Sequence, residues 1–190
     1  METAIDLSIR GIWIAVGLVW LAASWGVKRT VRRQSAPSRL VHMLIMCAVF
    51  ALLFSGYLSI GPLAWRIAPD TPVFLCSGLA MTIAGCAIAV WARLLLGGNW
   101  SGSVTVKQGH SLIRQGPYAI VRHPIYSGGL LGLMGTAVAF GELRGFLGVA
   151  LAFIGWSTKS RMEEAFMIEQ FGDNYRRYQR EVKRLIPFVL

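Results

Sequence analysis

Long apolar stretches, separated by short polar segments, dominate the hydrophobic pattern of this chain. Stretches without Asp, Glu, Lys or Arg extend over residues 11–27, 40–65, 73–92, 124–141 and 145–158. A helix needs about 20 apolar residues, in a range of about 17 to 25, to cross the hydrocarbon core of a bilayer. The first four stretches meet this requirement, and a helix in the fifth can continue through Lys159 and Arg161, whose long side chains can reach the headgroups. The pattern predicts an all-α integral membrane protein with about five transmembrane helices.

Only three residues, 142–144, separate the fourth apolar stretch from the fifth. A connection this short predicts a tight hairpin of helices 4 and 5, in which the chain crosses the membrane and returns. Residues just before the fourth helix and just after the fifth would then emerge on the same membrane face. The sequence therefore predicts that the Arg122–His123 pair lies near the Glu163–Glu164 pair. Two adjacent glutamates at that interface need cations or a polar ligand, and the less favoured alternative is that they only pair with Lys159, Arg161 or Arg122.

Composition and charge support a membrane location. Of the 190 residues, 55% are hydrophobic and only 15% are charged, which would leave a soluble domain with too little polar surface. The formal net charge of +10 is more typical of cytoplasmic segments that face anionic membrane lipids than of a nucleic-acid partner, because the chain is so apolar. Sixteen of the nineteen Lys and Arg residues fall on one predicted side. This asymmetry predicts an N-terminus outside, with the C-terminus and the candidate active site in the cytoplasm.

The three cysteines give no sign of a metal or disulfide site. Cys47, Cys76 and Cys86 all lie within apolar stretches and lack the spacing of metal ligands. Such residues usually act as small buried hydrophobes. We therefore expect no metal ion.

The longest polar connection, residues 97–125, contains glycines, aromatic residues and the histidines His110 and His123. Connections of this length are usually functional when they are not disordered. Pro124 favours a helix that starts directly after His123, because proline suits the first helical turn. The free N–H groups at such a start suit a carboxylate or phosphate, and the small residues at 127–129 let a ligand or another helix approach closely. Simple helix packing explains the same residues equally well.

The C-terminal tail carries apolar residues at helical spacing among basic ones. They are Phe171, Tyr175, Tyr178, Val182 and Leu185, at intervals of four, three, four and three residues. This pattern predicts a C-terminal amphipathic helix. Such a helix suits the surface of an anionic leaflet, and it could instead fold under the polar site as a floor.

The second half of the chain carries a series of ordered motifs. They are GGNWS at 97–101, GHSLIRQGPYAIVRHPIYSGG at 109–129, MEEAFMIEQFGDNYRRY at 162–178 and RLIP at 184–187. With these motifs, the segment from Gly98 to Pro187 resembles the isoprenylcysteine carboxyl methyltransferase family, within the wider group of membrane phospholipid and isoprenylcysteine methyltransferases. The Arg-His-Pro-x-Tyr run alone is less specific, because membrane sterol reductases carry a similar run. Residues up to about Ala92 match the family only as generic hydrophobic helices.

The resemblance implies a cytoplasmic pocket for S-adenosyl-L-methionine and a lipidic or prenylated acceptor that enters from the bilayer. It implies a cofactor-binding and catalytic region at 97–190, after an acceptor-shaping region of three helices at 1–96. Arg122 and Glu163 would lie closest to the acceptor and act as catalytic residues. The cofactor pocket would be lined by His110, Leu112, Ile113, Gly116, Tyr118, His123, Pro124, Tyr126, Ser127 and Glu164.

The leading interpretation is carboxyl methylation of an isoprenylcysteine-like acceptor, and other acceptors stay open. A carboxylate is already a nucleophile, so the protein would mainly align it and exclude water, with an arginine holding it bidentately. A phospholipid or other amine would have to lose a proton, which makes His123 or Glu163 a candidate base. A membrane reductase that uses NADPH and a non-catalytic scaffold are further alternatives. The glutamate pair and the FGDNY run disfavour the reductase.

Overall fold

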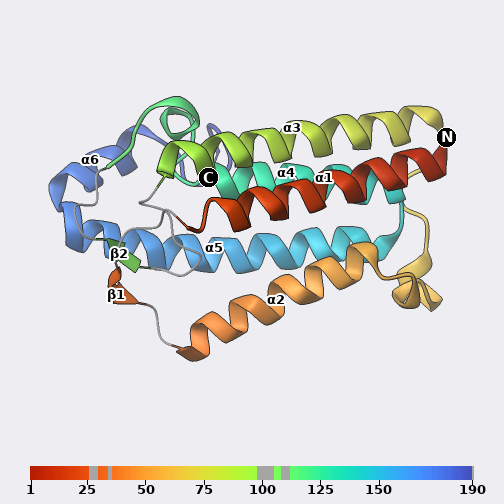
Figure 1. The fold of residues 1–190 in the computed structure, drawn as a ribbon, viewed down its shortest axis with the longest axis horizontal. Coiled ribbons are helices and arrows are strands. Elements are labelled where there is room, and N and C mark those ends of the chain that lie inside the picture. The colour runs from red at the N-terminus through yellow and green to blue at the C-terminus, as the bar shows by residue number, and fades with distance from the viewer. Residues whose placement is uncertain (26–29, 34–35, 98–104, 108–111, 190) are drawn as a thin grey trace.

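The computed structural model describes residues 1–25, 30–33, 36–97, 105–107 and 112–189 (Figure 1). Within these residues the chain forms six α-helices, short 3-10 helices and one two-stranded sheet. The α-helices are α1 (Glu2–Ala22), α2 (Ala36–Phe54), α3 (Pro72–Leu96), α4 (Pro124–Phe140), α5 (Leu143–Phe171) and α6 (Asp173–Glu181). The 3-10 helices are η1 (Gly56–Leu58), η2 (Gly61–Ala64) and η4 (Gly116–Ala119), and the strands are β1 (Thr30–Arg33) and β2 (Thr105–Lys107).

Three helices, α1, α2 and α3, are long and apolar enough to cross a membrane, with 21, 19 and 25 residues. α4 is apolar but has only 17 residues, and α5 is apolar in its first half and charged in its second. The predicted architecture of apolar membrane helices is confirmed, whereas the number of five crossings stays a prediction. The chain is not purely α, because β1 and β2 pair in antiparallel orientation.

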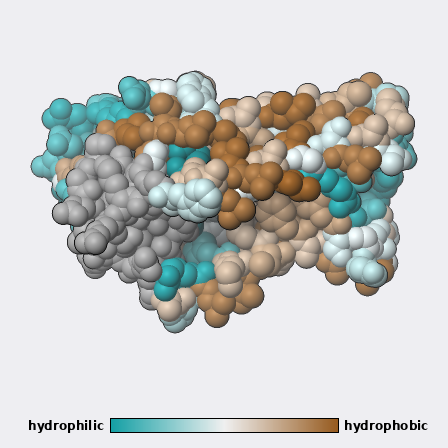
Figure 2. Space-filling model, in the orientation of Figure 1, coloured by the Kyte–Doolittle hydropathy of each residue, from teal (hydrophilic) through white to brown (hydrophobic). Residues whose placement is uncertain are grey.

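The surface has the polarity expected of a membrane protein. Apolar residues cover most of the visible face over the long helices, and hydrophilic residues gather at its two ends, including the end that carries α6 (Figure 2). Large hydrophobic side chains on α1 and α2 are exposed, among them Leu7, Leu18 and Met43. Such a surface is stable in lipid, where apolar side chains need not be buried.

α3 and α4 form the most extensive helix contact among the described elements. Glycines face one another here: a methyl group on Gly85 would lie 2.2 Å from the backbone nitrogen of Gly132, and one on Gly128 would lie 2.6 Å from the carbonyl oxygen of Gly85. Small residues let membrane helices approach this closely. The hydroxyl of Thr82 also lies 3.3 Å from the carbonyl oxygen of Gly132. This contact fixes α4 relative to α3.

The other long helices surround this pair. α2 packs on α5, α5 packs on α4, and α1 packs on α3. Gly141, with φ of +76°, ends α4, and α5 begins at Leu143. At this connection the guanidinium of the buried Arg144 donates to the carbonyl oxygens of Leu52 and Ser55, each at 2.9 Å. Arg144 thereby caps the end of α2 and holds it to the connection between α4 and α5.

The predicted C-terminal helix is shorter than its apolar spacing indicates. α6 ends at Glu181, and Val182 is extended, with φ of −124° and ψ of 136°. Lys183 then pairs in parallel with Val121. The prediction is wrong beyond Glu181 because carbonyl groups of residues 182–189, the C-terminal strap, bond to the start of α4 instead of continuing the helix. The two tyrosines of α6 are buried, and Gln179 of α6 donates to Glu164 of α5, so this helix packs against the polar site.

Candidate active site

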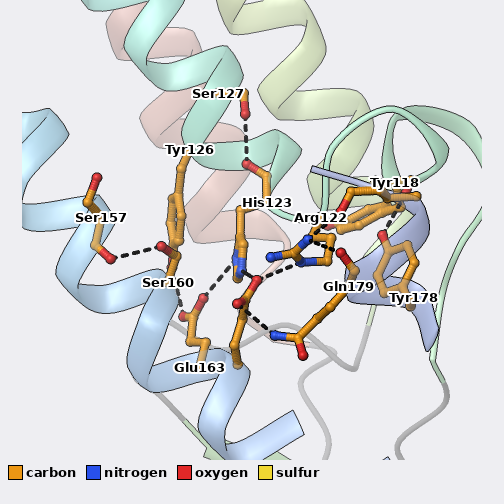
Figure 3. A network of polar contacts seen from close by, with 12 residues as sticks. Tyr118, Arg122, His123, Tyr126, Ser127, Ser157, Ser160, Glu163, Tyr178 and Gln179 are labelled. Carbon is orange, nitrogen blue, oxygen red and sulfur yellow. Dashed lines mark hydrogen bonds and ion pairs between the residues drawn. The ribbon is translucent and has the colours of Figure 1, made fainter. Parts of the chain in front are cut away.

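Polar side chains from separate segments of the chain meet at the end of the molecule that carries α6 (Figure 3). They come from residues 118–123, the first turn of α4, the charged half of α5, and α6 with the C-terminal strap. The predicted meeting of the Arg122–His123 pair with the Glu163–Glu164 pair is confirmed by their contacts. The roles predicted for these residues stay predictions.

α4 begins at Pro124, with His123 as its N-cap residue. The predicted start is correct, but the backbone donors just before it are not free. The N–H of Arg122 donates to the carbonyl oxygen of Lys183 at 2.8 Å, and the N–H of His123 donates to that of Arg184 at 3.0 Å. The C-terminal strap therefore occupies two backbone donors at this helix start, and the expectation that the start of α4 binds an anion stays a prediction.

The imidazole of His123 lies between the two glutamates of α5. Its Nδ1 is 3.4 Å from Oε2 of Glu163, and its Nε2 is 3.3 Å from Oε1 of Glu164. Burial by itself lowers the pKa of His123, but hydrogen bonds to Glu163 and Glu164 more than offset burial, so the pKa lies above the ordinary value of 6.5. Protonation lets both ring nitrogens donate to the carboxylates. The ring therefore changes the net charge of the site by one unit when it titrates.

Arg122 and Glu164 form a buried ion pair. Nε of Arg122 donates to Oε1 of Glu164 at 2.7 Å, and Nη1 donates to the carbonyl oxygens of Gln179, at 3.2 Å, and Val182. Nε2 of Gln179 donates to the other carboxylate oxygen of Glu164 at 3.0 Å. Burial disfavours the charge of Glu164, but bonds from His123 and Arg122 outweigh it and lower the pKa to about 2. Glu164 therefore stays ionised, and Arg122 links it to α6 and the strap.

Tyr126 connects Glu163 with an aromatic stack. Its hydroxyl donates to Oε1 of Glu163 at 2.7 Å. Its ring stacks on His123 at a centroid distance of 5.6 Å and an angle of 4°, and on Trp156 at 5.6 Å and 10°. Burial disfavours the charge of Glu163, but His123, Lys159 and Tyr126 together lower its pKa. An ionised carboxylate thus lies beside three near-parallel rings, a combination that suits a flat or cationic group.

Two tyrosines join η4 to its neighbours. The hydroxyl of Tyr118 donates to the carbonyl oxygen of Ala92 on α3 at 3.2 Å, and the hydroxyl of Tyr178 donates to the carbonyl oxygen of Tyr118 at 2.5 Å. Burial raises the pKa of both phenols, so both act as neutral donors. Gly116 begins η4 at φ of +60°, where a methyl group would lie 2.7 Å from the side chain of Leu95. η4 is thus fixed between α3 and α6.

The residues predicted to line a cofactor pocket fall into three groups. Tyr118, His123, Pro124, Tyr126, Ser127 and Glu164 lie in the cluster just described or on the turn that carries it. Leu112 and Ile113 are partly buried in the segment that leads to η4, and Gly116 begins η4. His110 lies outside the described residues. The assignment of all of them to a cofactor stays a prediction.

Sequence reasoning missed three residues of the site. Trp156 ends the aromatic stack, and Gln179 donates to Glu164. Nε of Arg184 is buried and has no hydrogen-bond partner among the described residues. Trp156 could have been found, because it precedes Glu163 by seven residues, or about two helical turns, and so shares its face of α5. Nothing in the local sequence marks Gln179 or Arg184, which reach the site through the turn after α5 and the path of the strap.

Fold and site together define a helical membrane protein with two ionised glutamates and an aromatic stack at one end of its helices. Among the described residues, no group of three or more His, Cys, Asp or Glu side chains could hold a metal ion. The chain belongs to the phospholipid methyltransferase family, whose sequence model matches residues 73–174. This match extends from α3 into the start of α6 and contains Arg122, His123 and both glutamates.

Individual relatives carry a more specific name. The chain is 31% identical over 120 residues to a protein-S-isoprenylcysteine O-methyltransferase of Schizosaccharomyces pombe, covering 62% of this chain and 51% of that protein. It is 30% identical over 118 residues to the Homo sapiens protein of the same name, covering 60% of this chain and 41% of that protein. The chain therefore spans about half the length of the relatives it matches. The predicted resemblance to this group of methyltransferases is confirmed.

A solved structure shares the fold. It is that of the eukaryotic intramembrane Ras methyltransferase ICMT, with a TM-score of 0.53 and 24% sequence identity, over 82% of this chain and 54% of that one. At this identity the likeness shows the fold alone. It supports the assignment of the apolar helices to an integral membrane protein.

Proposed function

We propose that this chain is an S-adenosyl-L-methionine-dependent membrane methyltransferase that methylates the carboxylate of an isoprenylcysteine-like lipid. The observation that carries the proposal is the cluster of His123, Tyr126, Glu163 and Glu164, which lies within the segment that the family matches. The names of the relatives from S. pombe and human support this class of acceptor.

The charges of the cluster fit a ligand with a positive sulfur. Glu163 and Glu164 have lowered pKa values and stay ionised, and Arg122 supplies one positive charge. Arg122 pairs with Glu164, and we propose that the carboxylate of Glu163, which also lies near Lys159, faces the sulfonium. S-Adenosyl-L-methionine would supply a methyl group activated by its sulfonium.

The cofactor-binding residues that we propose come from three segments. They are His110, Leu112, Ile113, Gly116 and Tyr118 before α4, His123, Pro124, Tyr126 and Ser127 at its start, and Glu164 on α5. Arg184 adds a second argument for a polar ligand, because its buried Nε has no hydrogen-bond partner among the described residues. A buried donor of this kind is stabilised when a ligand supplies the acceptor.

Arg122 and Glu163 are the residues that we propose nearest the reacting atoms. Nε and Nη1 of Arg122 are engaged by Glu164 and by backbone carbonyls, so its remaining nitrogen, Nη2, is the edge available to an acceptor carboxylate. The carboxylate is the nucleophile and needs no base, so the residues of the site have to align it with the methyl group and exclude water. His123 then has an electrostatic role and need not accept a proton.

A phospholipid amine is the second acceptor class, and the name of the matching family supports it. An amine must lose a proton before or during methyl transfer, and His123 can accept one only while it is neutral. The raised pKa of His123 makes that neutral form scarcer near neutral pH. We therefore favour the carboxylate.

We further propose five crossings, with α4 and α5 as the fourth and fifth. The N-terminus would lie outside, and the C-terminus and active site in the cytoplasm, because sixteen of the nineteen Lys and Arg residues would then lie inside. Region 1–96 would shape the acceptor path and region 97–190 would bind the cofactor. Reporter fusions at residue 1 and after Leu190 test this topology, and both ends on one side of the membrane would overturn it.

Binding and transfer assays test the function. Purified protein in detergent should bind labelled S-adenosyl-L-methionine, and excess NADPH should not displace it. The protein should then methylate a farnesylated cysteine analogue faster than phosphatidylethanolamine. Glu164→Gln should abolish cofactor binding, whereas Glu169→Gln, at an exposed position on the same helix, should not. Binding of NADPH without binding of S-adenosyl-L-methionine would overturn the proposal.

A further inference from the structure

The C-terminal strap has a polar inner side and an apolar tip. Leu185 is buried, whereas Phe188 and Val189 are 90% and 73% exposed. The tip is a turn in which the N–H of Val189 donates to the carbonyl oxygen of Ile186 at 3.2 Å, and Phe188 has φ of +65°. Positive φ is uncommon for an aromatic residue, and water would favour a small polar residue at such a turn. The tip is therefore unsuited to an aqueous surface.

The strap runs along the start of α4 in the direction of that helix. It pairs in parallel with Val121, and the carbonyl oxygen of Arg184 then accepts from the N–H of His123. The carbonyl oxygen of Leu185 accepts from the hydroxyl of Ser127. The successive partners lead from the loop into the first turn of α4. The tip directly follows Leu185 and therefore begins beside the first turn of α4.

The length of α4 sets the depth of this tip. Its 17 residues span about 25 Å at a rise of about 1.5 Å per residue, which is less than the hydrocarbon thickness of about 30 Å. If α4 is to cross, its first turn must lie at the edge of the hydrocarbon. Leu185 bonds to that turn, so residues 186–189 lie near the same edge.

Charge on the neighbouring surface fits an anionic membrane. Exposed basic residues outside the ion pairs lie on α6 and at the beginning of the strap, namely Arg177, Arg180 and Lys183. Acidic neighbours are largely neutralised, because Asp173 pairs with Arg176, and Glu181 with Arg114. Anionic leaflets bind surfaces that place apolar residues at the edge of the hydrocarbon and basic residues beside them.

We propose that the C-terminal strap is a lipid anchor: its tip, residues 186–189, inserts between the headgroups and acyl chains of an anionic leaflet. Because the strap also binds the backbone of Arg122 and His123, insertion holds these residues in the site. The proposal rests on α4 crossing the membrane. It does not depend on which reaction the site performs.

The first test measures the depth of the tip in nanodiscs that contain phosphatidylglycerol. A nitroxide is attached to Val189→Cys, with Cys47 and Cys76 replaced by serine because both are exposed. The matched control is Asn174→Cys, on the exposed side of α6. The label at position 189 should collide severalfold more with oxygen, and severalfold less with a water-soluble nickel chelate, than the label at position 174. Equal nickel collision at the two positions would overturn the proposal.

The second test measures the link between the tip and the site. Phe188→Glu places a charge in the tip, and Tyr57→Glu is the matched control at an exposed aromatic residue of η1. In the same nanodiscs, amide hydrogen exchange at Arg122 and His123 should become severalfold faster in Phe188→Glu and stay unchanged in Tyr57→Glu. Unchanged exchange in Phe188→Glu would overturn the link. Neither measurement requires methyl transfer, so a wrong assignment of the reaction would leave both results interpretable.

Discussion

Nε of Arg122 lies 2.7 Å from Oε1 of Glu164, and the two side chains are only 9% and 10% exposed. Arg122 also donates to carbonyl groups of α6 and the C-terminal strap. One guanidinium thus links the start of α4, the charged half of α5 and the end of the chain. Removing one partner of a buried ion pair leaves an uncompensated charge. A substitution at Arg122 or Glu164 should therefore lower activity more than a substitution at a surface ion pair.

Arg122→Lys tests this linkage. We expect it to lower kcat/KM for a farnesylated cysteine analogue by about tenfold or more, because lysine keeps the charge but cannot form the same fork of bonds to Glu164 and the Val182 carbonyl. Arg114→Lys is the matched control, since Arg114 and Glu181 form an exposed pair, and such pairs contribute about 0 to 1 kcal/mol. Equal activity of the two variants would contradict a special role for Arg122.

The bond between Tyr126 and Glu163 should support cofactor binding. We expect Tyr126→Phe to weaken binding of S-adenosylhomocysteine by about twofold to tenfold, the effect of losing one hydrogen bond. Glu163→Gln alone should also weaken binding, and the double variant should lose less than the product of the single effects because the partners interact. Isothermal titration of detergent-solubilised protein measures all four affinities. If the double variant loses the full product of the two single effects, the contact between Tyr126 and Glu163 does not contribute to cofactor binding.

The titration of His123 should change the preference for a cationic ligand. The pKa of His123 is raised above 6.5. The ring therefore carries a positive charge at pH values below its raised pKa, and it loses this charge as the pH rises through that pKa. The affinity for S-adenosyl-L-methionine, relative to S-adenosylhomocysteine, should therefore increase with pH. The ratio of the two affinities is measured over a pH series that begins below pH 6.5 and rises from there. His123→Gln should give a ratio that does not vary with pH, and a persistent step in that variant would assign the titration to another group.

The glycine contact of α3 with α4 should tolerate no added methyl group. A Cβ on Gly85 would lie 2.2 Å from the backbone nitrogen of Gly132, which cannot rotate away. We expect Gly85→Ala to lower the thermal unfolding temperature and the yield of folded protein, at the upper end of the roughly 1 to 3 kcal/mol seen for overpacking. Gly17→Ala, with nothing within 4 Å of its Cβ, should unfold at or above the wild-type temperature. Similar melting of both variants would refute the close approach.

Local sequence patterns predicted the elements that depend on local chemistry. Pro124 marked the start of α4, and the short connection before α5 placed the glutamate pair near His123. The end of α6 could not be predicted in this way. The apolar positions Val182 and Leu185 fit a helical period, but carbonyl bonds to the start of α4 override it.

The detailed pairing within the site also lay beyond the sequence. Several basic side chains near the glutamates were equally plausible partners, and only the path of the C-terminal strap selects Arg122 for Glu164. The pairing of β1 with β2 joins segments more than seventy residues apart, for which the local sequence carries no signal.

Backbone atoms make the closest contacts of α3 with α4, between Gly85 and both Gly128 and Gly132. Backbone atoms have no rotamers, so these contacts leave the two helices little room to slide past one another. α3 and α4 should therefore behave as one rigid frame throughout any conformational cycle. Because Tyr118 is bonded to α3 and His123 begins α4, that frame carries part of the site with it. If the proposed lipidic acceptor enters from the bilayer, we expect the helices that move to admit it to be α1, α2 or α5.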